Sequence, residues 1–251
     1  MVAACKLCLF QKDLIKKSHI FSEFLYTDFY DENHKMLSFA PKNLNEKNSR
    51  IKRISKGEYE CGILCSDCEI IISKYESYAR KILLGGSFQI NEKPIYKHFK
   101  NLKDQEITQI SNVDYSNFKL FILSLIWRAS ISSRPLFKEI NLTNYNEILR
   151  EMLFERNPGE ECDFPLMCFH YIKDDSIPKD VLIIGQPTFQ IVDDITICKL
   201  LLRKYWIFCA LGLKVNNMFF SEFTIKKTNQ LVLFSVPNGK GSQFLKNHFD
   251  I

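Results

Sequence analysis

Two pairs of closely spaced cysteines are the residues best suited to chemistry in this sequence. Cys5 and Cys8 stand in the tetrapeptide CKLC, and Cys65 and Cys68 stand in CSDC. Each C-x-x-C pair places two sulfur ligands on one tight turn, which is half of the ligand set of a tetrahedral zinc site. The two pairs together predict one closed four-cysteine site for Zn2+.

The spacing between the pairs leaves alternatives open. The 56 residues between Cys8 and Cys65 exceed the usual zinc-finger spacing, so this segment must leave the site and return as an insert. Cys61 could replace Cys65 as a ligand, because a C-x3-C spacing is also usable. Reduced core thiols would not explain Cys5 and Cys8 so near a polar terminus. A redox pair needs a preceding parallel strand, which neither pair has.

Composition and charge limit the class of protein. The chain has 251 residues, of which 46% are hydrophobic and 25% charged, which is typical of a globular protein with one large domain or two unequal ones. A net charge of +5 permits a polyanionic partner without requiring one. The N-terminus lacks the pattern of a secretory signal, and the odd number of nine cysteines argues against a disulfide framework. We therefore expect a cytoplasmic protein.

Three helices are predicted, the first of them from apolar periodicity. The first follows Cys65, with Ser66 or Asp67 as its cap, and ends at Gly85–Gly86. The second runs from Tyr115 to about Ser132; its apolar window is too short for the roughly 20 residues of a membrane span, so no membrane partner is expected. We expect Arg128 in this helix to point to solvent. The third runs from Tyr145 to Arg156, opened by a capping box of Asn144 and Glu147 and ended by Pro158–Gly159.

Short β-rich runs follow residue 180, and they predict an antiparallel sheet packed by the second and third helices. The runs are VLIIG, TFQIV, ITICKLLL, YWIFCALGLKV and QLVLFSV, with KKTNQ and PNGKG as turns. The fold class is therefore α+β. We expect two domains, a zinc module at 1–100 and an α+β domain of unknown role at 114–251, with the boundary at 101–113.

The zinc module has a recognisable layout. A first cysteine pair in an N-terminal turn, then a β-hairpin, then a second pair at the start of a helix is typical of a treble clef. The segments CKLC, KSHIF (Lys17–Phe21) and LCSDCE (Leu64–Glu69) resemble the zinc-containing branch of the HNH, or ββα-metal, endonucleases. The resemblance covers about residues 1–85.

The resemblance implies a catalytic site as well as a fold. In that family the histidine of the HI strand is the general base that activates water against a nucleic acid phosphodiester, and one divalent metal stabilises the phosphate. His19 matches this base. Glu69 stands where the family places metal ligands on the helix, and a carboxylate suits Mg2+ or Mn2+. Further acids and a histidine lie between the pairs, with an exposed polar face as their plainer interpretation: Glu23, Asp31, Glu32 and His34. Asp67 lies inside the second pair and could assist the metal, with helix capping as its plainer role.

A basic insert offers a surface for phosphates. Residues 41–56 carry one acid and six basic residues, among them Arg50, Lys52, Arg53 and Lys56. The HNH-like interpretation predicts an endonuclease, in a context such as phage defence or a mobile element. The alternative is a zinc-stabilised module that binds nucleic acid or a protein partner without chemistry.

Overall fold

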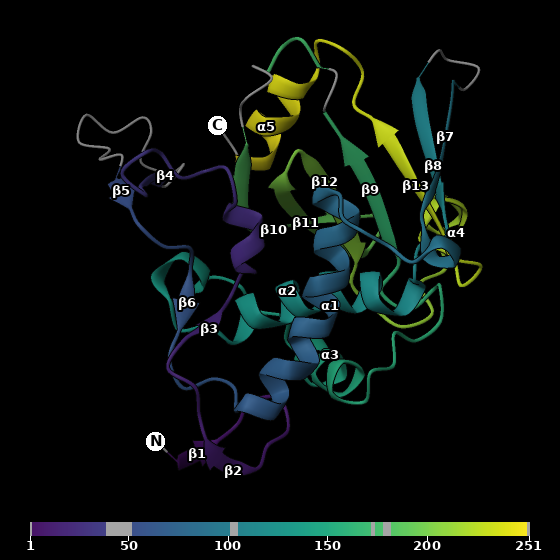
Figure 1. The fold of residues 1–251 in the computed structure, drawn as a ribbon. Coiled ribbons are helices and arrows are strands. Elements are labelled where there is room, and N and C mark those ends of the chain that lie inside the picture. The colour runs from purple at the N-terminus through teal and green to yellow at the C-terminus, as the bar shows by residue number, and fades with distance from the viewer. Residues whose placement is uncertain (1, 39–51, 101–104, 172–173, 178–181, 250–251) are drawn as a thin grey trace.

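The computed structural model describes residues 2–38, 52–100, 105–171, 174–177 and 182–249. Figure 1 shows a large sheet with helices packed against it and, along the left side, the small strand pairs of the N-terminal part. The α-helices are α1 (Ser66–Leu84), α2 (Tyr115–Ile131), α3 (Tyr145–Phe154), α4 (Met218–Phe223) and α5 (Gly241–Phe249), and short 3-10 turns lie at Glu23–Tyr26, Ile90–Glu92 and Pro135–Phe137. Helices and a large sheet together confirm the α+β class.

Three two-stranded sheets belong to the N-terminal part, and seven strands form the large sheet. The small antiparallel pairs are β1 (Val2–Ala4) with β2 (Gln11–Asp13), β3 (Ser18–His19) with β6 (Tyr59–Glu60), and β4 (Met36–Ser38) with β5 (Lys52–Ile54). The strands of the large sheet, in spatial order, are β10 (Ile183–Val192), β11 (Ile195–Arg203), β12 (Tyr205–Ala210), β9 (Leu166–His170), β13 (Gln230–Ser235), β8 (Glu106–Ser111) and β7 (Ile95–Lys100).

The large sheet is mixed, so the prediction of a purely antiparallel sheet is wrong in one place. Strands β9 and β13 pair in parallel, with Leu233 opposite Cys168, and every other neighbouring pair is antiparallel. The reason is topological. The antiparallel group β9–β12 and the antiparallel group β7, β8 and β13 are joined along this one pair. Residues 183–185 of the predicted run VLIIG and the whole run TFQIV belong to a single strand, β10, whose register shifts between Gly185 and Thr188.

The sheet lies between two helical layers. Side chains alternate between its faces, so neighbours on β12 enter different clusters. Ile207 joins the main core with Phe121 of α2, whereas Trp206 packs with Tyr171 and with Phe244 of α5. Helices α1, α2 and α3 thus cover one face, and α4 and α5 cover the other (Figure 1).

The three predicted helices form, but the side-chain caps predicted for the starts of α1 and α3 do not. Helix α1 follows Cys65 and ends at Gly85, whose φ of 79° is the left-handed conformation that glycine adopts at low cost. No side chain caps its start. Helix α2 is capped by Asp114, which accepts a hydrogen bond from the backbone of Asn117. The capping box predicted for α3 does not form, because Asn144 is itself helical and makes no capping bond.

The predicted domain boundary falls within a β-hairpin. Strand β7 lies before it and pairs with β8, which lies inside 101–113. The main hydrophobic core is also continuous from Ile20 and Ile72 to Leu231 of the large sheet. The division into two domains stays a prediction. In the part of the chain that the structure describes, no helix has the length and apolar character needed to cross a membrane.

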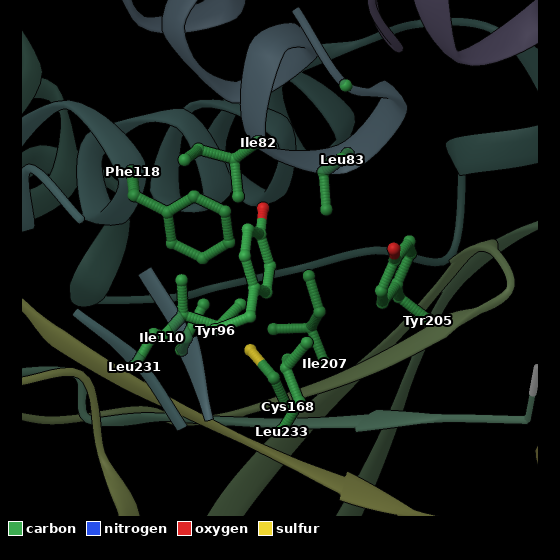
Figure 2. Close-up of a pocket in the computed structure, with 11 residues that line it drawn as sticks. Ile82, Leu83, Tyr96, Ile110, Phe118, Cys168, Tyr205, Ile207, Leu231 and Leu233 are labelled. Atoms are coloured by element: carbon green, nitrogen blue, oxygen red, sulfur yellow. The ribbon is translucent and has the colours of Figure 1, made fainter. Parts of the chain in front are cut away.

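A pocket lies where the C-terminal end of α1 meets the sheet. Figure 2 shows Ile82 and Leu83 of α1 on one side and Ile207, Leu231 and Leu233 of the strands on the other. Its volume is about 240 Å³. The sheet face under α1 is therefore not completely filled.

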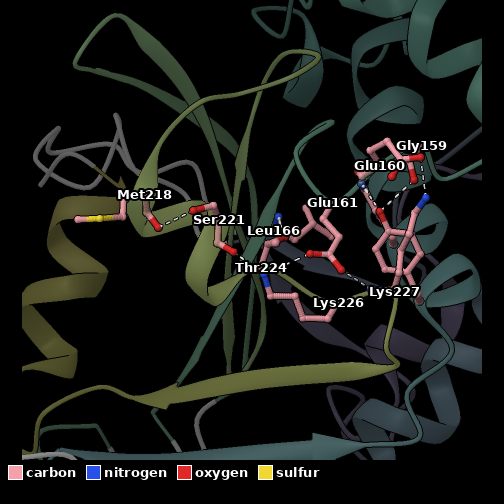
Figure 3. Close-up of polar contacts among 11 residues, drawn as sticks. Gly159, Glu160, Glu161, Leu166, Met218, Ser221, Thr224, Lys226 and Lys227 are labelled. Atoms are coloured by element: carbon pink, nitrogen blue, oxygen red, sulfur yellow. Dashed lines mark hydrogen bonds and ion pairs between the residues drawn. The ribbon is translucent and has the colours of Figure 1, made fainter.

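A buried lysine, Lys119, follows Phe118 of the pocket lining on α2. Lys119 of α2 has no exposed surface, and its ammonium group donates to the hydroxyl of Tyr115 at 2.9 Å and to the carbonyl of Glu160 at 2.7 Å. Figure 3 shows Glu160 also bound to Lys227, at 2.6 Å. Burial lowers the pKa of Lys119 to about 8. The loop after α3 is thus tied to both α2 and the turn before β13.

We expect Lys119 to make stability depend on pH. Between the folded pKa of about 8 and the unfolded value of roughly 10.4, the unfolded chain binds a proton that the folded protein does not, so this group makes stability rise with pH there. Replacing Lys119 with Met removes that rise. Urea unfolding at pH 7.5 and 9.5 should show the wild type gaining roughly 1–2 kcal/mol relative to Lys119→Met.

The matched control is Lys214→Met, which removes an exposed lysine. Its difference from the wild type should not change with pH. An equally flat difference for Lys119→Met would contradict the assignment.

Candidate metal centre

The four predicted cysteine ligands lie together. The sulfur atoms of Cys5, Cys8, Cys65 and Cys68 all lie within 4.8 Å of one another, and all four residues are buried. Cys8 Sγ and Cys65 Sγ are 3.9 Å apart. Tetrahedral zinc with Zn–S bonds of about 2.3 Å needs sulfur atoms about 3.8 Å apart. All four are free cysteines, so the cluster could hold a metal ion such as zinc.

Backbone hydrogen bonds shape the first cysteine pair. It occupies the turn between β1 and β2, where Cys5 N donates to Phe10 O at 2.9 Å and Leu9 N donates to Cys5 O at 2.8 Å. Leu9 has a φ of 65°, which closes the turn. Cys5 and Cys8 therefore face the same side of a fixed loop.

The second pair is held against this loop by backbone contacts. Cys65 is the N-cap of α1 and Cys68 lies in its first turn, so both sulfurs lie at the helix start. The backbone of Cys65 donates to Cys5 Sγ at 3.3 Å, and Lys6 N donates to Ile63 O at 2.9 Å. Cys61 is exposed and outside the cluster, which excludes it as the replacement for Cys65.

The cysteine thiols of the cluster strongly change one another's pKa values. A hydrogen bond from Cys68 lowers the pKa of Cys5 to about 4, while the same bond raises the pKa of Cys68 and burial raises the pKa of Cys8. One negative charge is therefore favoured and further ones are opposed. A divalent cation removes this conflict, because it stabilises all four thiolates at once.

Basic side chains surround the cluster. Arg150 of α3 donates to the carbonyl of Leu7, inside the first cysteine turn, at 2.8 Å. Lys12 on β2 pairs with Asp67 at 2.7 Å, so Asp67 holds the hairpin to α1 and does not cap the helix as predicted. Lys6 binds the last residue of α2, Ile131, through its carbonyl at 2.8 Å. These cations oppose the net negative charge of a metal with four thiolates.

His19 lies on β3 and is partly exposed. Its Nε2 is 3.0 Å from a carboxylate oxygen of Glu23, and its ring lies edge-on to Tyr59. A carboxylate that orients an imidazole is the arrangement found around many general bases. Its backbone carbonyl accepts a hydrogen bond from Arg128 at 2.6 Å, which fixes the strand. The role of His19 as a base stays a prediction.

Glu69 lies in a different environment from the one predicted for a metal ligand. Burial raises the pKa of its carboxyl group, and the charge of Arg128 opposes that change. Within the described residues, one of its carboxylate oxygens and the hydroxyl of Ser18 are buried without a hydrogen bond of normal geometry, although Ser18 is close enough to lower the pKa of Glu69. Within the described residues, the four cysteines form the only group of three or more histidine, cysteine or acidic side chains placed to share a metal. Glu69 and His19 are not in such a group.

The other candidates between the cysteine pairs are engaged locally. Asp31 accepts hydrogen bonds from the backbones of Asn33 and Lys35, and His34 stacks on Tyr30 with ring centres 4.1 Å apart. Lys52, Arg53 and Lys56 are exposed near the β4–β5 pair. Arg50 lies outside the described residues.

The predicted orientation of the Arg128 side chain is wrong. Its side chain is fully buried, not directed to solvent, and it pairs with Glu76 of α1 at 2.7 Å. It also donates to Ser22 and to the carbonyl of His19. The sequence did carry a signal for this pairing. Arg128 stands in a largely apolar helix, and a charged side chain must be paired when its helix is buried.

The chain was compared with models of protein families, with curated proteins and with solved structures, and none of these comparisons gave a significant match.

We expect one zinc ion per chain, lost on Cys68→Ser. That substitution removes one of four ligands and leaves three mutually repelling thiols, so bound zinc should fall below about 0.2 per chain and the melting temperature by roughly 6–12 °C. Cys61→Ser is the control, since Cys61 is exposed and lies outside the cluster. Elemental analysis and thermal unfolding measure both. Equal zinc in the two variants would contradict this centre.

Arg128→Ala should destabilise the protein by about 3–5 kcal/mol, because it leaves Glu76 without its partner and the His19 carbonyl without its donor. Arg80→Ala, on the exposed side of α1, should change the free energy of unfolding by less than about 0.5 kcal/mol. Denaturant unfolding compares them. Similar losses in the free energy of unfolding for both variants would show that Arg128 does not hold α2 to α1 and β3.

Proposed function

We propose that the N-terminal part is a zinc treble clef that binds nucleic acid without cleaving it. Four protein sulfurs within 4.8 Å of one another form a closed ligand set, which supports a structural zinc ion. The observation that carries the absence of cleavage is that, within the described residues, no second group of side chains is placed to share a catalytic metal. A catalytic zinc site keeps a position open for water or substrate, whereas a structural site is filled by protein. The order of hairpin turn, small strand pair and helix start supports the treble-clef assignment.

An exposed basic surface near this module supports nucleic acid as the partner. Strands β4 and β5 lie at the periphery of the molecule, away from the large sheet (Figure 1). Lys52 and Arg53 project from β5 and Lys56 follows it, all three exposed. Arg53 approaches Asp31 only to 3.9 Å and keeps 70% of its side-chain surface exposed. These charges are therefore available to phosphates, which bind such side chains independently of sequence.

Binding should depend on these three side chains and on salt. We expect the triple variant Lys52→Ala, Arg53→Ala, Lys56→Ala to lose about tenfold or more in affinity for a fluorescent 20-nucleotide duplex or single strand, with a smaller salt slope. The control is Lys214→Ala, Lys240→Ala, Lys246→Ala, which removes the same charge from exposed positions elsewhere.

Fluorescence anisotropy at several salt concentrations distinguishes the two variants. Equal losses would mean that net charge alone drives binding. Absence of binding by the folded, zinc-loaded wild type at low salt would contradict the proposal.

A metal-dependent endonuclease of HNH type is the second candidate, and the His19–Glu23 pair favours it. The imidazole is accessible, and a carboxylate 3.0 Å away can orient it to take a proton from water. This candidate also requires a catalytic Mg2+ or Mn2+, for which Glu69 is the helix residue that the resemblance implies. The buried environment of Glu69 beside Arg128 makes it the weaker part of the case.

Cleavage assays decide between the two candidates. Under the first, wild-type protein leaves DNA and RNA intact with Mg2+ or Mn2+ while still binding them. Under the second, strand scission appears and falls at least about 100-fold in His19→Ala but not in His98→Ala, a histidine on the far edge strand β7.

A further inference from the structure

We propose that the pocket between α1 and the large sheet binds a small, uncharged and largely apolar molecule with one hydrogen-bond acceptor. The pocket is lined by the last turn of α1, by Phe118 of α2 and by five strands. Figure 2 shows these side chains converging on one space. It is independent of the proposed nucleic-acid function, because the four-cysteine cluster lies at the opposite end of α1, roughly 20 Å away at 1.5 Å per residue.

The size and lining of the pocket set the class of ligand. Its volume of about 240 Å³ exceeds the roughly 150 Å³ of an apolar cavity that admits benzene. None of the eleven lining residues is charged, and Ile207, Leu231 and Leu233 supply apolar surface from the sheet. Placing a charge there would be costly. An uncharged molecule of one or two aromatic rings fits these conditions.

Two tyrosine hydroxyls supply the polar contact. In Figure 2, the ring of Tyr96 reaches from β7 toward Ile82 and Leu83, and the hydroxyl of Tyr205 lies at another side of the same space. Neither hydroxyl has a hydrogen-bond partner among the described residues, although each can donate and accept. Burial raises the pKa of Tyr205, so its hydroxyl keeps its proton at neutral pH. A carbonyl oxygen of a ligand would match these donors.

The pocket is also open to entry. Tyr96 is on the edge strand of the sheet and is 48% exposed, so the part of the lining that it forms is partly open to solvent. The helix ends at Gly85, which itself lines the space, and no side chain extends from that position. A ligand can therefore reach the interior without unfolding of the sheet.

The probe for this site is 6-propionyl-2-(dimethylamino)naphthalene, which has two fused rings, one carbonyl and no charge, and emits more strongly at shorter wavelength in apolar surroundings. We expect saturable binding of one probe per full-length chain. Leu83→Trp, at a half-buried position of the lining, should weaken binding at least about tenfold by filling the pocket. Leu37→Trp is the matched control, since Leu37 is exposed on β4.

A second variant keeps the size of the pocket and removes its polar groups. Tyr96→Phe with Tyr205→Phe should weaken binding about threefold to tenfold, because the carbonyl of the probe loses its donors. Circular dichroism confirms that each variant is folded. Binding that is equal in Leu83→Trp and Leu37→Trp, binding unaffected by the double Phe variant, or no saturable binding by the wild type would each overturn the proposal.

Discussion

Four sulfur atoms within 4.8 Å of one another, in a buried space, form the constraint on which the N-terminal part depends. Without a cation, ionisation of one thiol opposes ionisation of its neighbours, as the opposite pKa changes of Cys5 and Cys68 illustrate. With a divalent metal, the same atoms form four strong bonds that join two segments far apart in sequence. The hairpin of β1 and β2 and the start of α1 have little other reason to meet, because the strands of this region are only two or three residues long.

Two buried arginines connect the N-terminal part to the helices and the large sheet. Arg128 of α2 binds the carbonyl of His19 and the carboxylate of Glu76. Arg203 of β11 pairs with Asp28 at 2.8 Å and donates to the carbonyl of Leu25 at 3.1 Å. Both bind the segment that follows the first cysteine pair. The N-terminal part with the four-cysteine cluster and the large sheet therefore share polar contacts as well as one hydrophobic core.

Local patterns predicted local features well. The C-x-x-C spacings identified all four members of the cluster, and apolar periodicity and helix start and stop residues located α1, α2 and α3. These signals depend only on residues that are near one another in sequence. The α+β class was correct, but the parallel pairing of β9 with β13 was not foreseen, since strand order depends on contacts between distant segments. Strands β7, β8 and β9 of the large sheet precede residue 180 and were missed. The pattern EITQIS of β8 carries few apolar residues, yet Ile107 and Ile110 are buried. The pairing of Arg128 with Glu76 likewise joins two helices and cannot be read from either one.

The central claim is that one metal ion with four cysteine ligands holds the N-terminal part together, and the coordination sphere of the metal tests it most directly. X-ray absorption at the zinc edge of the purified, full-length protein should show four sulfur neighbours at about 2.3 Å and no nitrogen or oxygen ligand. A mixed sphere with a nitrogen or oxygen ligand, or a protein that folds without a stoichiometric metal, would contradict the account.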